Sequence, residues 1–146
     1  MLSIIIPAYN EEKRIPETLN RILHYLKRKK INNEIIVVVD KSKDKTLEVV
    51  QKYSKKFKNI KYIYNPGKCG KGYALKKGIL SSKGSLVLFT DADTSTPITE
   101  LGKFLPKIGE SDIVIGSRAH KESNVRRKLI SRVILGNLGN FLLRLF

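Results

Sequence analysis

Short runs of β-branched and other apolar residues recur along this chain, each followed by a longer stretch in which apolar residues repeat every three or four positions. Runs of the first kind are typical of buried strands, and repeats of the second kind are typical of helices that pack on one face. Their regular alternation predicts an α/β domain with a mainly parallel sheet flanked by helices. A chain of 146 residues has room for one such core and little more.

The pattern predicts five strands and four helices. The strands are residues 2–6, 34–39, 60–64, 85–89 and 112–115, and the helices are residues 14–29, 44–56, 73–80 and 98–105. In the first helix, the apolar side chains of Ile15, Leu19, Ile22, Leu23 and Leu26 share one face. Because composition changes after Arg118, we divide the chain into a core, residues 1–122, and a tail, residues 123–146.

The tail mixes large apolar residues with arginine and lysine. Five basic side chains within residues 125–146 make a transmembrane helix unfavourable. A basic amphipathic helix lying in a membrane interface is one interpretation. A helix that packs on the domain is the other, and the sequence favours neither.

Charge and cysteine content narrow the setting of the protein. Lysine and arginine number 29 against 13 acidic residues, a net charge of +16, which predicts anionic partners such as nucleotide phosphates or an anionic membrane surface. The sequence contains no RNA- or DNA-binding motif, so we expect no nucleic-acid partner. The single cysteine excludes an intrachain disulfide, and the first apolar run is too short for a signal peptide. We therefore expect a cytoplasmic protein, peripheral at the cytoplasmic face of a membrane.

The most informative motif is Asp91-Ala92-Asp93, placed directly after the predicted strand 85–89. Two carboxylates one residue apart at a strand end can face one metal ion, because alternate side chains point the same way. Their oxygen ligands suit Mg²⁺ or Mn²⁺, which would in turn bridge a diphosphate. A solvated turn is the alternative, because so short a pattern often arises by chance.

Polar residues also follow the first two predicted strands, at positions 7–12 and 40–44. The carboxyl ends of parallel strands meet at one sheet edge, where α/β proteins bind ligands, so these residues should converge with the aspartates. An acidic side chain there can accept hydrogen bonds from a base or ribose, and Tyr9 could flank a base. Helix N-capping is the alternative for three of the polar residues, Asn10, Ser42 and Asp44.

The loop 65–72 contains three glycines and two lysines, Lys68 and Lys71. Glycine lets a backbone approach a ligand closely, and lysine beside a helix N-terminus could meet phosphate. A plain turn is an equally good interpretation for Lys68. The glycine spacing matches neither a P-loop nor a dinucleotide-binding fingerprint, so an NTPase and a Rossmann dehydrogenase are not supported. Arg118, which follows the last predicted strand, could bind a diphosphate.

Together these segments resemble family 2 glycosyltransferases of the GT-A fold, in particular the dolichyl-phosphate glucose and mannose synthases. The resemblance is carried by residues 4–12, 37–46, 67–72, 89–93 and 115–118. Asp40 matches the second of the family's paired aspartates, whereas Val39 and Lys41 depart from the usual pattern. The family's catalytic region usually continues past an arginine-rich stretch, so we expect this chain to be short at its C-terminus relative to the family.

The resemblance also implies roles for individual residues. Pro7, Tyr9 and Glu11 would contact the nucleoside, Asp40 the base, and Asp91 and Asp93 the metal and the diphosphate sugar, with Arg118 near the phosphates. The expected activity is inverting transfer of a hexose, glucose in preference, from UDP-glucose or GDP-mannose to a polyprenyl or dolichyl phosphate. The alternatives are a non-catalytic nucleotide-sugar-binding module that needs a partner chain and a transferase acting on a glycan hydroxyl.

Overall fold

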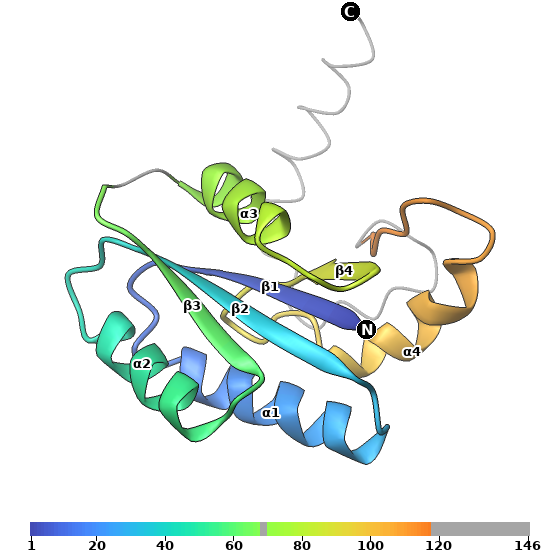
Figure 1. Cartoon of the computed structure of the whole chain (residues 1–146), viewed down its shortest axis with the longest axis horizontal. Helices are drawn as coiled ribbons and strands as arrows, with labels where there is room; N and C mark the ends of the chain where they lie inside the picture. The colour runs from blue at the N-terminus through green and yellow to red at the C-terminus, as the bar shows by residue number, and fades with distance from the viewer. Residues whose placement is uncertain (68–69, 118–146) are drawn as a thin grey trace, which may run out of the picture. The chain divides into compact units, whose positions relative to one another are not determined.

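The computed structural model describes residues 1–67 and 70–117, and its centre is a four-stranded parallel sheet (Figure 1). The strands are β1 (Leu2–Ala8), β2 (Asn33–Asp40), β3 (Ile60–Asn65) and β4 (Leu86–Phe89), in the spatial order β3-β2-β1-β4. Helices α1 (Ile15–Arg28), α2 (Thr46–Lys56) and α3 (Lys71–Leu80) connect successive strands. The predicted α/β architecture is confirmed.

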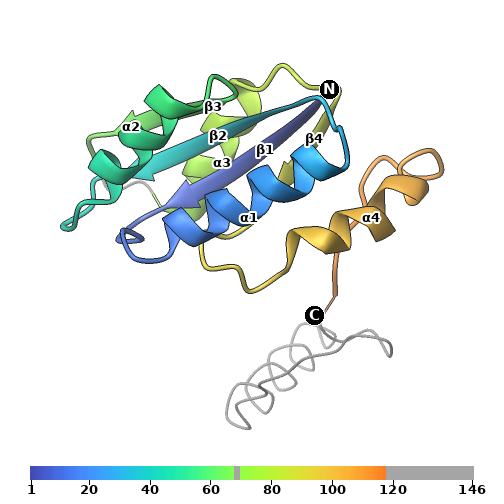
Figure 2. The same ribbon diagram turned by 90° about the horizontal axis from the view of Figure 1, so that it is seen from below.

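Helices cover both faces of the sheet. Helices α1 and α2 lie on one face and α3 lies on the other (Figures 1 and 2). On the α1 side, Ile4 and Val37 pack in one buried cluster with Leu19, while Ile5 and Val38 face α3 in a second cluster. A parallel sheet buried on both faces needs strands that are apolar at nearly every position, which explains the continuous apolar runs of β1 and β2.

Strand β4 ends before its neighbour β1 does. The register pairs Ile5 with Phe89 at the end of β4, and the N–H of Thr90 donates to the Ile5 carbonyl over 3.1 Å. Alternate backbone groups of a strand face the same neighbour, so the nitrogen of Pro7 points to the side of β4 at a level that β4 does not reach. Proline in this central strand therefore costs no ladder hydrogen bond, unlike proline between two full-length partners.

The region after β4 differs from the prediction. Residues 98–107 form a 3₁₀ turn η1 (Ile98–Glu100), one α-helical turn α4 (Leu101–Phe104) and a second 3₁₀ turn η2 (Leu105–Lys107). The α-helical turn does not continue through Pro106, which has no N–H to donate to the preceding turn.

The predicted fifth strand, residues 112–115, is wrong for the part of the chain that the structure describes. Residues 111–117 form no strand, and Ile113 and Ile115 are 79% and 75% exposed. A strand exists only where a neighbour satisfies its backbone hydrogen bonds, and no described segment pairs with this one. Its apolar alternation is therefore compatible with a strand without being sufficient for one.

The chain divides into two compact units, Met1–Lys103 and Phe104–Phe146, of which the first contains the whole sheet. The proposed boundary between residues 122 and 123, and the amphipathic helix expected in 123–146, lie outside the described residues. Among the residues that are described, no helix is both long and apolar enough to cross a membrane.

A buried carboxylate, Glu34, fastens the amino-terminal ends of the strands. Its Oε1 accepts hydrogen bonds from the Ser3 hydroxyl (2.8 Å) and the Lys83 N–H (2.6 Å), and its Oε2 accepts one from the Lys61 ammonium (2.9 Å). Burial raises the pKa of Glu34, but these hydrogen bonds outweigh that effect and lower the pKa to about 2. One carboxylate thus ties β1, β2, β3 and the loop before β4 together.

Replacing Glu34 with glutamine should lower the free energy of unfolding near neutral pH by roughly 1–3 kcal/mol, because buried charge-assisted hydrogen bonds are lost. The folded-state pKa of Glu34 lies below its ordinary value of 4.5. The wild type therefore keeps this stabilisation above pH 4.5 and loses it as the pH falls toward 2. Urea unfolding should show the two proteins converging in acid.

The control for this experiment is Glu17→Gln, which removes an exposed ion pair with Arg21. It should change the free energy of unfolding by less than about 0.5 kcal/mol. Equal stability of Glu34→Gln and the wild type at neutral pH would contradict the assignment.

Candidate functional site

A pocket of about 380 Å³ opens at the carboxyl edge of the sheet, within the first unit. It is lined by Pro7, Ala8, Tyr9, Glu11, Arg14, Asp40, Gly70, Lys71, Asp91, Ala92 and Asp93. These residues come from the ends of β1 and β2, the start of α1, the start of α3 and the loop after β4. The residues to which the sequence assigned nucleotide, sugar or metal contacts all line this one pocket, except Arg118; Arg118 and the alternative phosphate contact Lys68 lie outside the described residues.

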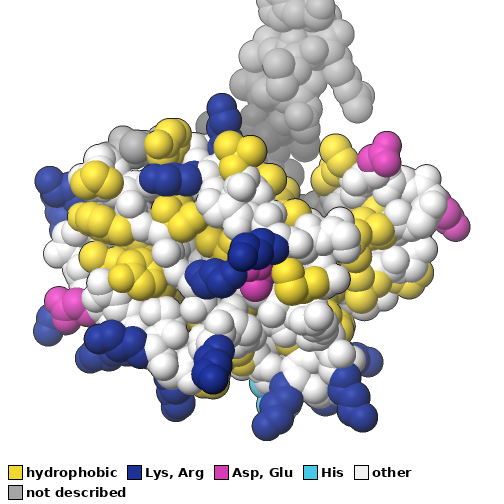
Figure 3. Space-filling view, viewed as in Figure 1, with side chains coloured by type: hydrophobic (Ala, Val, Ile, Leu, Met, Phe, Trp, Pro, Cys, Tyr) yellow, Lys and Arg dark blue, Asp and Glu magenta, His cyan; other side chains and the backbone are white. Residues whose placement is uncertain are grey.

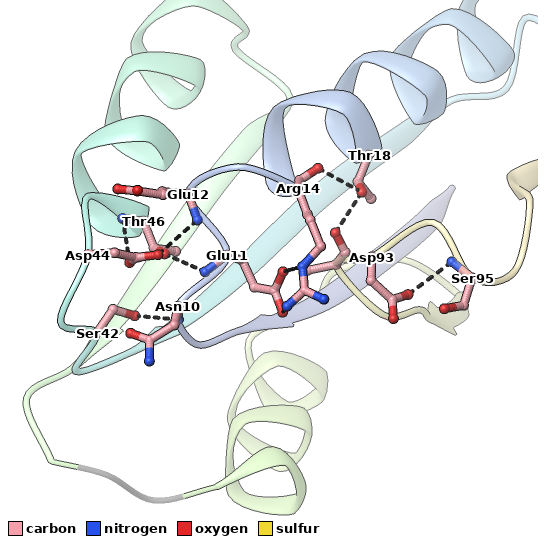
Figure 4. Close-up of polar contacts among 11 residues, drawn as sticks. Asn10, Glu11, Glu12, Arg14, Thr18, Ser42, Asp44, Thr46, Asp93 and Ser95 are labelled. Atoms are coloured by element: carbon pink, nitrogen blue, oxygen red, sulfur yellow. Dashed lines mark hydrogen bonds and ion pairs between the residues drawn. The ribbon is translucent and has the colours of Figure 1, made fainter. Parts of the chain in front are cut away.

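The loop after β4 holds Asp91 and Asp93 on either side of a buried alanine. The carbonyl of Ala92 accepts a hydrogen bond from the Thr18 hydroxyl on α1 over 2.7 Å, and Oδ1 of Asp93 accepts one from the Ser95 N–H over 2.9 Å (Figure 4). The loop is therefore anchored both to α1 and to its own next turn. This anchoring keeps both carboxylates at the pocket.

The pKa of Asp93 lies below its ordinary value. Hydrogen bonds from Ser95 lower the pKa of Asp93, burial opposes them in part, and the positive charge of Arg14 lowers the pKa further. The next residue, Thr94, has a φ of 56°, in the left-handed region that a β-branched residue rarely adopts. Strained backbone of this kind is often found where a turn serves a functional site.

Glu11 and Arg14 form an ion pair in the pocket wall. Nη2 of Arg14 donates to Oε1 of Glu11 over 2.7 Å, and its Nε lies 2.6 Å from Oε2. Burial raises the pKa of Glu11, Arg14 lowers it in part, and the charges of Asp93 and Asp44 raise it, so that the net shift is upward. The sequence reasoning missed Arg14, although its position three residues after Glu11 is typical of a paired charge near a helix start.

Asp40 fastens the loop that leads into α3. The carboxylate is buried; its Oδ1 accepts a hydrogen bond from the Asn65 amide (2.7 Å), and its Oδ2 accepts one from the Gly70 N–H (3.1 Å). Gly70 has a φ of 81°, which favours glycine. Lys71 then begins α3, two residues earlier than predicted, and its ammonium lies 2.6 Å from Oδ1 of Asp91.

Five hydrogen bonds interlock the β1–α1 loop with the β2–α2 loop and Thr46, the first residue of α2. Each joins a backbone N–H of one segment to a side-chain oxygen of the other, and Figure 4 shows those accepted by Ser42, Asp44 and Thr46. The donor and acceptor pairs are Asn10 and Ser42 (3.1 Å), Glu11 and Thr46 (2.7 Å), Glu12 and Asp44 (3.1 Å), Lys43 and Asn10 (2.8 Å), and Lys45 and Glu12 (2.8 Å). The two loops therefore hold each other in place beside the pocket.

Helix capping is wrong for Asn10 and Ser42 but holds for Asp44, whose Oδ1 accepts a hydrogen bond from the N–H of Thr46, the first residue of α2, over 3.0 Å. The N-cap residues of α1 and α2 are Arg14 and Lys45, and neither makes a side-chain capping hydrogen bond. The side chains of Asn10 and Ser42 satisfy backbone groups across the interlocked loops, and Oδ2 of Asp44 does the same for the Glu12 N–H.

Thr46 is fully buried at the centre of the interlock. Its hydroxyl accepts from the Glu11 N–H and donates to Oδ1 of Asp44. Burial raises the pKa of Asp44, but hydrogen bonds from Thr46 and the Glu12 N–H outweigh it, so the pKa lies below its ordinary value. Thr46 thereby connects the backbone of a pocket residue to the opposite loop.

The two aspartates after β4 suit a divalent cation that is shared with a bound diphosphate. Within residues 1–67 and 70–117, no group of three or more acidic, histidine or cysteine side chains could hold a metal ion alone. Mg²⁺, and Mn²⁺ with similar ligands, commonly uses one or two carboxylates, with water and substrate phosphates completing the coordination. Asp91 and Asp93, which line one pocket, fit a site in which substrate phosphates and water complete the metal coordination.

A parallel α/β sheet with an acidic pocket at the carboxyl ends of its strands is the architecture of nucleotide-binding α/β proteins. Comparison with known proteins is more specific. The family model described as glycosyl transferase family 2 matches residues 3–144, and the chain belongs to this family. The predicted GT-A fold is confirmed by the solved structures that the chain resembles.

Three similar proteins illustrate the relationship. A dolichyl-phosphate beta-glucosyltransferase of Trichomonas vaginalis is 42% identical over 92% of this chain and 45% of its own length. S. aureus TarS, solved in complex with UDP-GlcNAc, is 28% identical, with a TM-score of 0.60 over 83% of this chain and 38% of that one. A mannosyltransferase from Pyrobaculum calidifontis, solved with GDP-Man and Mn²⁺, is 29% identical, with a TM-score of 0.55 over 63% and 27% of the two chains. The chain thus spans less than half the length of these proteins.

Replacing Thr46 with valine should lower the free energy of unfolding by roughly 1–3 kcal/mol, because the Glu11 N–H and the Asp44 carboxylate lose a buried partner. Thr46→Ser keeps the hydroxyl and should lose less. Urea denaturation of the three proteins measures the difference. If the valine variant were as stable as the serine variant, the hydroxyl would not be the connecting group.

Proposed function

We propose that this chain binds a nucleotide diphosphate sugar together with Mg²⁺ or Mn²⁺ and transfers its hexose, glucose in preference, to a polyprenyl or dolichyl phosphate with inversion. The observation that carries the proposal is the pocket that gathers Pro7, Tyr9, Glu11, Asp40, Lys71, Asp91 and Asp93 at the carboxyl edge of the sheet. The preference for glucose rests on similarity to dolichyl-phosphate beta-glucosyltransferases.

Each side of the pocket suits one part of the donor. Tyr9, Glu11 and Asp40 lie at the ends of β1 and β2 and offer an aromatic ring and carboxylates to a nucleoside. Lys71, at the start of α3, and the two aspartates after β4 lie where the diphosphate would be held. Arg118 would add a second cation for the phosphates, as the family resemblance implies.

The chemistry requires little of the protein beyond positioning and charge. A divalent cation held by Asp91 and Asp93 would offset the negative charge that develops on the leaving diphosphate. The acceptor is a phosphate monoester with a second pKa of about 6, so its oxygen is already largely anionic near neutral pH and needs no strong general base. Among the described residues no histidine lines the pocket, and the proposed chemistry needs none.

The acceptor is a lipid, which places the reaction at a membrane surface. The net charge of +16 and the predominance of lysine and arginine over acidic side chains on the surface in Figure 3 favour attraction to anionic headgroups. The basic residues of segment 123–146 would contribute to the same attraction. On this proposal the protein is peripheral, at the cytoplasmic face.

Asp93→Asn should weaken metal-dependent donor binding at least roughly tenfold, because it removes a charged metal ligand. Calorimetric titration with UDP-glucose and with GDP-mannose, each with and without Mn²⁺, measures the effect and identifies the donor. Asp112→Asn, a change of equal charge outside the pocket lining, is the control and should bind like the wild type. A wild type that binds neither donor would overturn the proposal.

The acceptor is tested separately by incubating the full chain with the preferred donor and dolichyl phosphate, and by assaying lipid-linked hexose. The proposal expects a lipid-linked product that requires the metal. Donor binding without transfer to any acceptor would support a non-catalytic module that needs a partner. Transfer only to glycan hydroxyls would support the other alternative.

A further inference from the structure

Some of the carboxylates in the pocket form ion pairs and others do not. Glu11 is paired with Arg14, and Asp91 is paired with Lys71. Asp93 is the remaining carboxylate at the metal end of the pocket, and no lysine or arginine of the described residues lies within 4 Å of it. In the free protein, therefore, one of the two expected metal ligands is open to a cation and the other is engaged.

The Lys71 ammonium competes directly with a metal ion for Asp91. Its Nζ lies 2.6 Å from Oδ1 of Asp91, within the region that a metal bound by that carboxylate would occupy. Two cations at one carboxylate oxygen repel each other, so a metal ion that uses Oδ1 of Asp91 displaces the ammonium. The displacement is sterically simple, because the Lys71 and Asp91 side chains are 57% and 51% exposed and lysine has a long flexible stem.

The backbone around Lys71 is fixed by hydrogen bonds, whereas its long side chain can change rotamer. Asp40 binds the N–H of Gly70, the residue before Lys71, and Lys71 is the first residue of the ten-residue helix α3. A displaced ammonium would therefore stay beside a helix N-terminus, where a phosphate group is favoured. The nearest new partner for Lys71 is then the diphosphate that arrives with the metal.

We propose that Lys71 is an exchangeable cation. It neutralises Asp91 in the empty pocket and transfers to the donor's diphosphate when the metal takes its place. This inference rests on the proposed function and adds to it a residue, Lys71, that couples the binding of the metal to the binding of the nucleotide. A free metal ion must displace Lys71 without compensation, whereas a metal ion that arrives with a diphosphate gives Lys71 a new partner. By linkage, the nucleotide gains from the metal by the same factor as the metal gains from the nucleotide.

The test measures Mn²⁺ affinity of the full chain by electron paramagnetic resonance of unbound Mn²⁺, with and without saturating UDP. Lys71→Met should tighten binding of Mn²⁺ alone roughly two- to fivefold, the range expected from the strength of an exposed ion pair. In the presence of UDP the gain should disappear, because Lys71 no longer contacts Asp91. Lys71→Arg, which can pair with both groups, should restore the wild-type dependence on UDP.

Lys76→Met is the matched control. Lys76 lies on the same helix, is exposed and does not line the pocket, so its removal changes net charge equally without affecting Asp91. An equal gain in Mn²⁺ affinity for Lys71→Met with and without UDP would indicate simple charge repulsion and would overturn the exchange. Equal effects of Lys71→Met and Lys76→Met, or no effect of Lys71→Met, would overturn it as well. If Mn²⁺ binding depends on UDP in the same way in Lys71→Met and in the wild type, the inference alone is overturned. If neither UDP-glucose nor GDP-mannose changes Mn²⁺ binding by the wild type, the proposed function is overturned.

Discussion

Strand β1 is hydrogen-bonded on both sides, to β2 along its full length and to β4 along its first part. This unequal pairing creates the space for the site. Because β4 stops opposite Ile5, the last residues of β1 have a neighbour on one side only, and the chain after β4 can turn across the sheet edge. Asp91 and Asp93 thereby lie beside Pro7 and Ala8 in the same pocket. The acidic loop depends on where one strand ends as much as on its own sequence.

Irregular backbone near a buried sheet edge needs hydrogen-bond partners for its N–H groups. In the loops around the pocket, side-chain oxygens supply them. Between β2 and α2 the chain alternates strictly. The side chains of Ser42, Asp44 and Thr46 accept three hydrogen bonds of the interlock, while Lys41, Lys43 and Lys45 are exposed. Although this segment has no regular secondary structure, its side chains alternate as in a strand, and one set faces the neighbouring loop.

Sequence patterns predicted the buried strands and the helices that pack on them, because burial requires apolar residues at regular spacings. From these elements followed the sheet, its parallel sense and the edge where the polar residues gather. They could not identify Thr18 or Asn65, because each makes its decisive hydrogen bond to a residue distant in sequence. The same limit explains residues 112–115, where apolar alternation indicated a strand but no described segment pairs with it. The pocket lining was predictable because parallel topology alone brings strand ends together, whereas the ion pairs and the interlock depend on side-chain geometry.

The interlock has a consequence for how this protein can vary and be engineered. Because each loop supplies side-chain oxygens for the other's backbone, the two loops form one structural unit despite the helix and strand between them. A change at Asn10 alters the support of Lys43, and a change at Asp44 alters the support of Glu12. A substitution that removes one of these oxygens leaves a backbone N–H of the other loop without that partner. Transplanting the nucleoside side of this pocket into another scaffold would require moving both loops together.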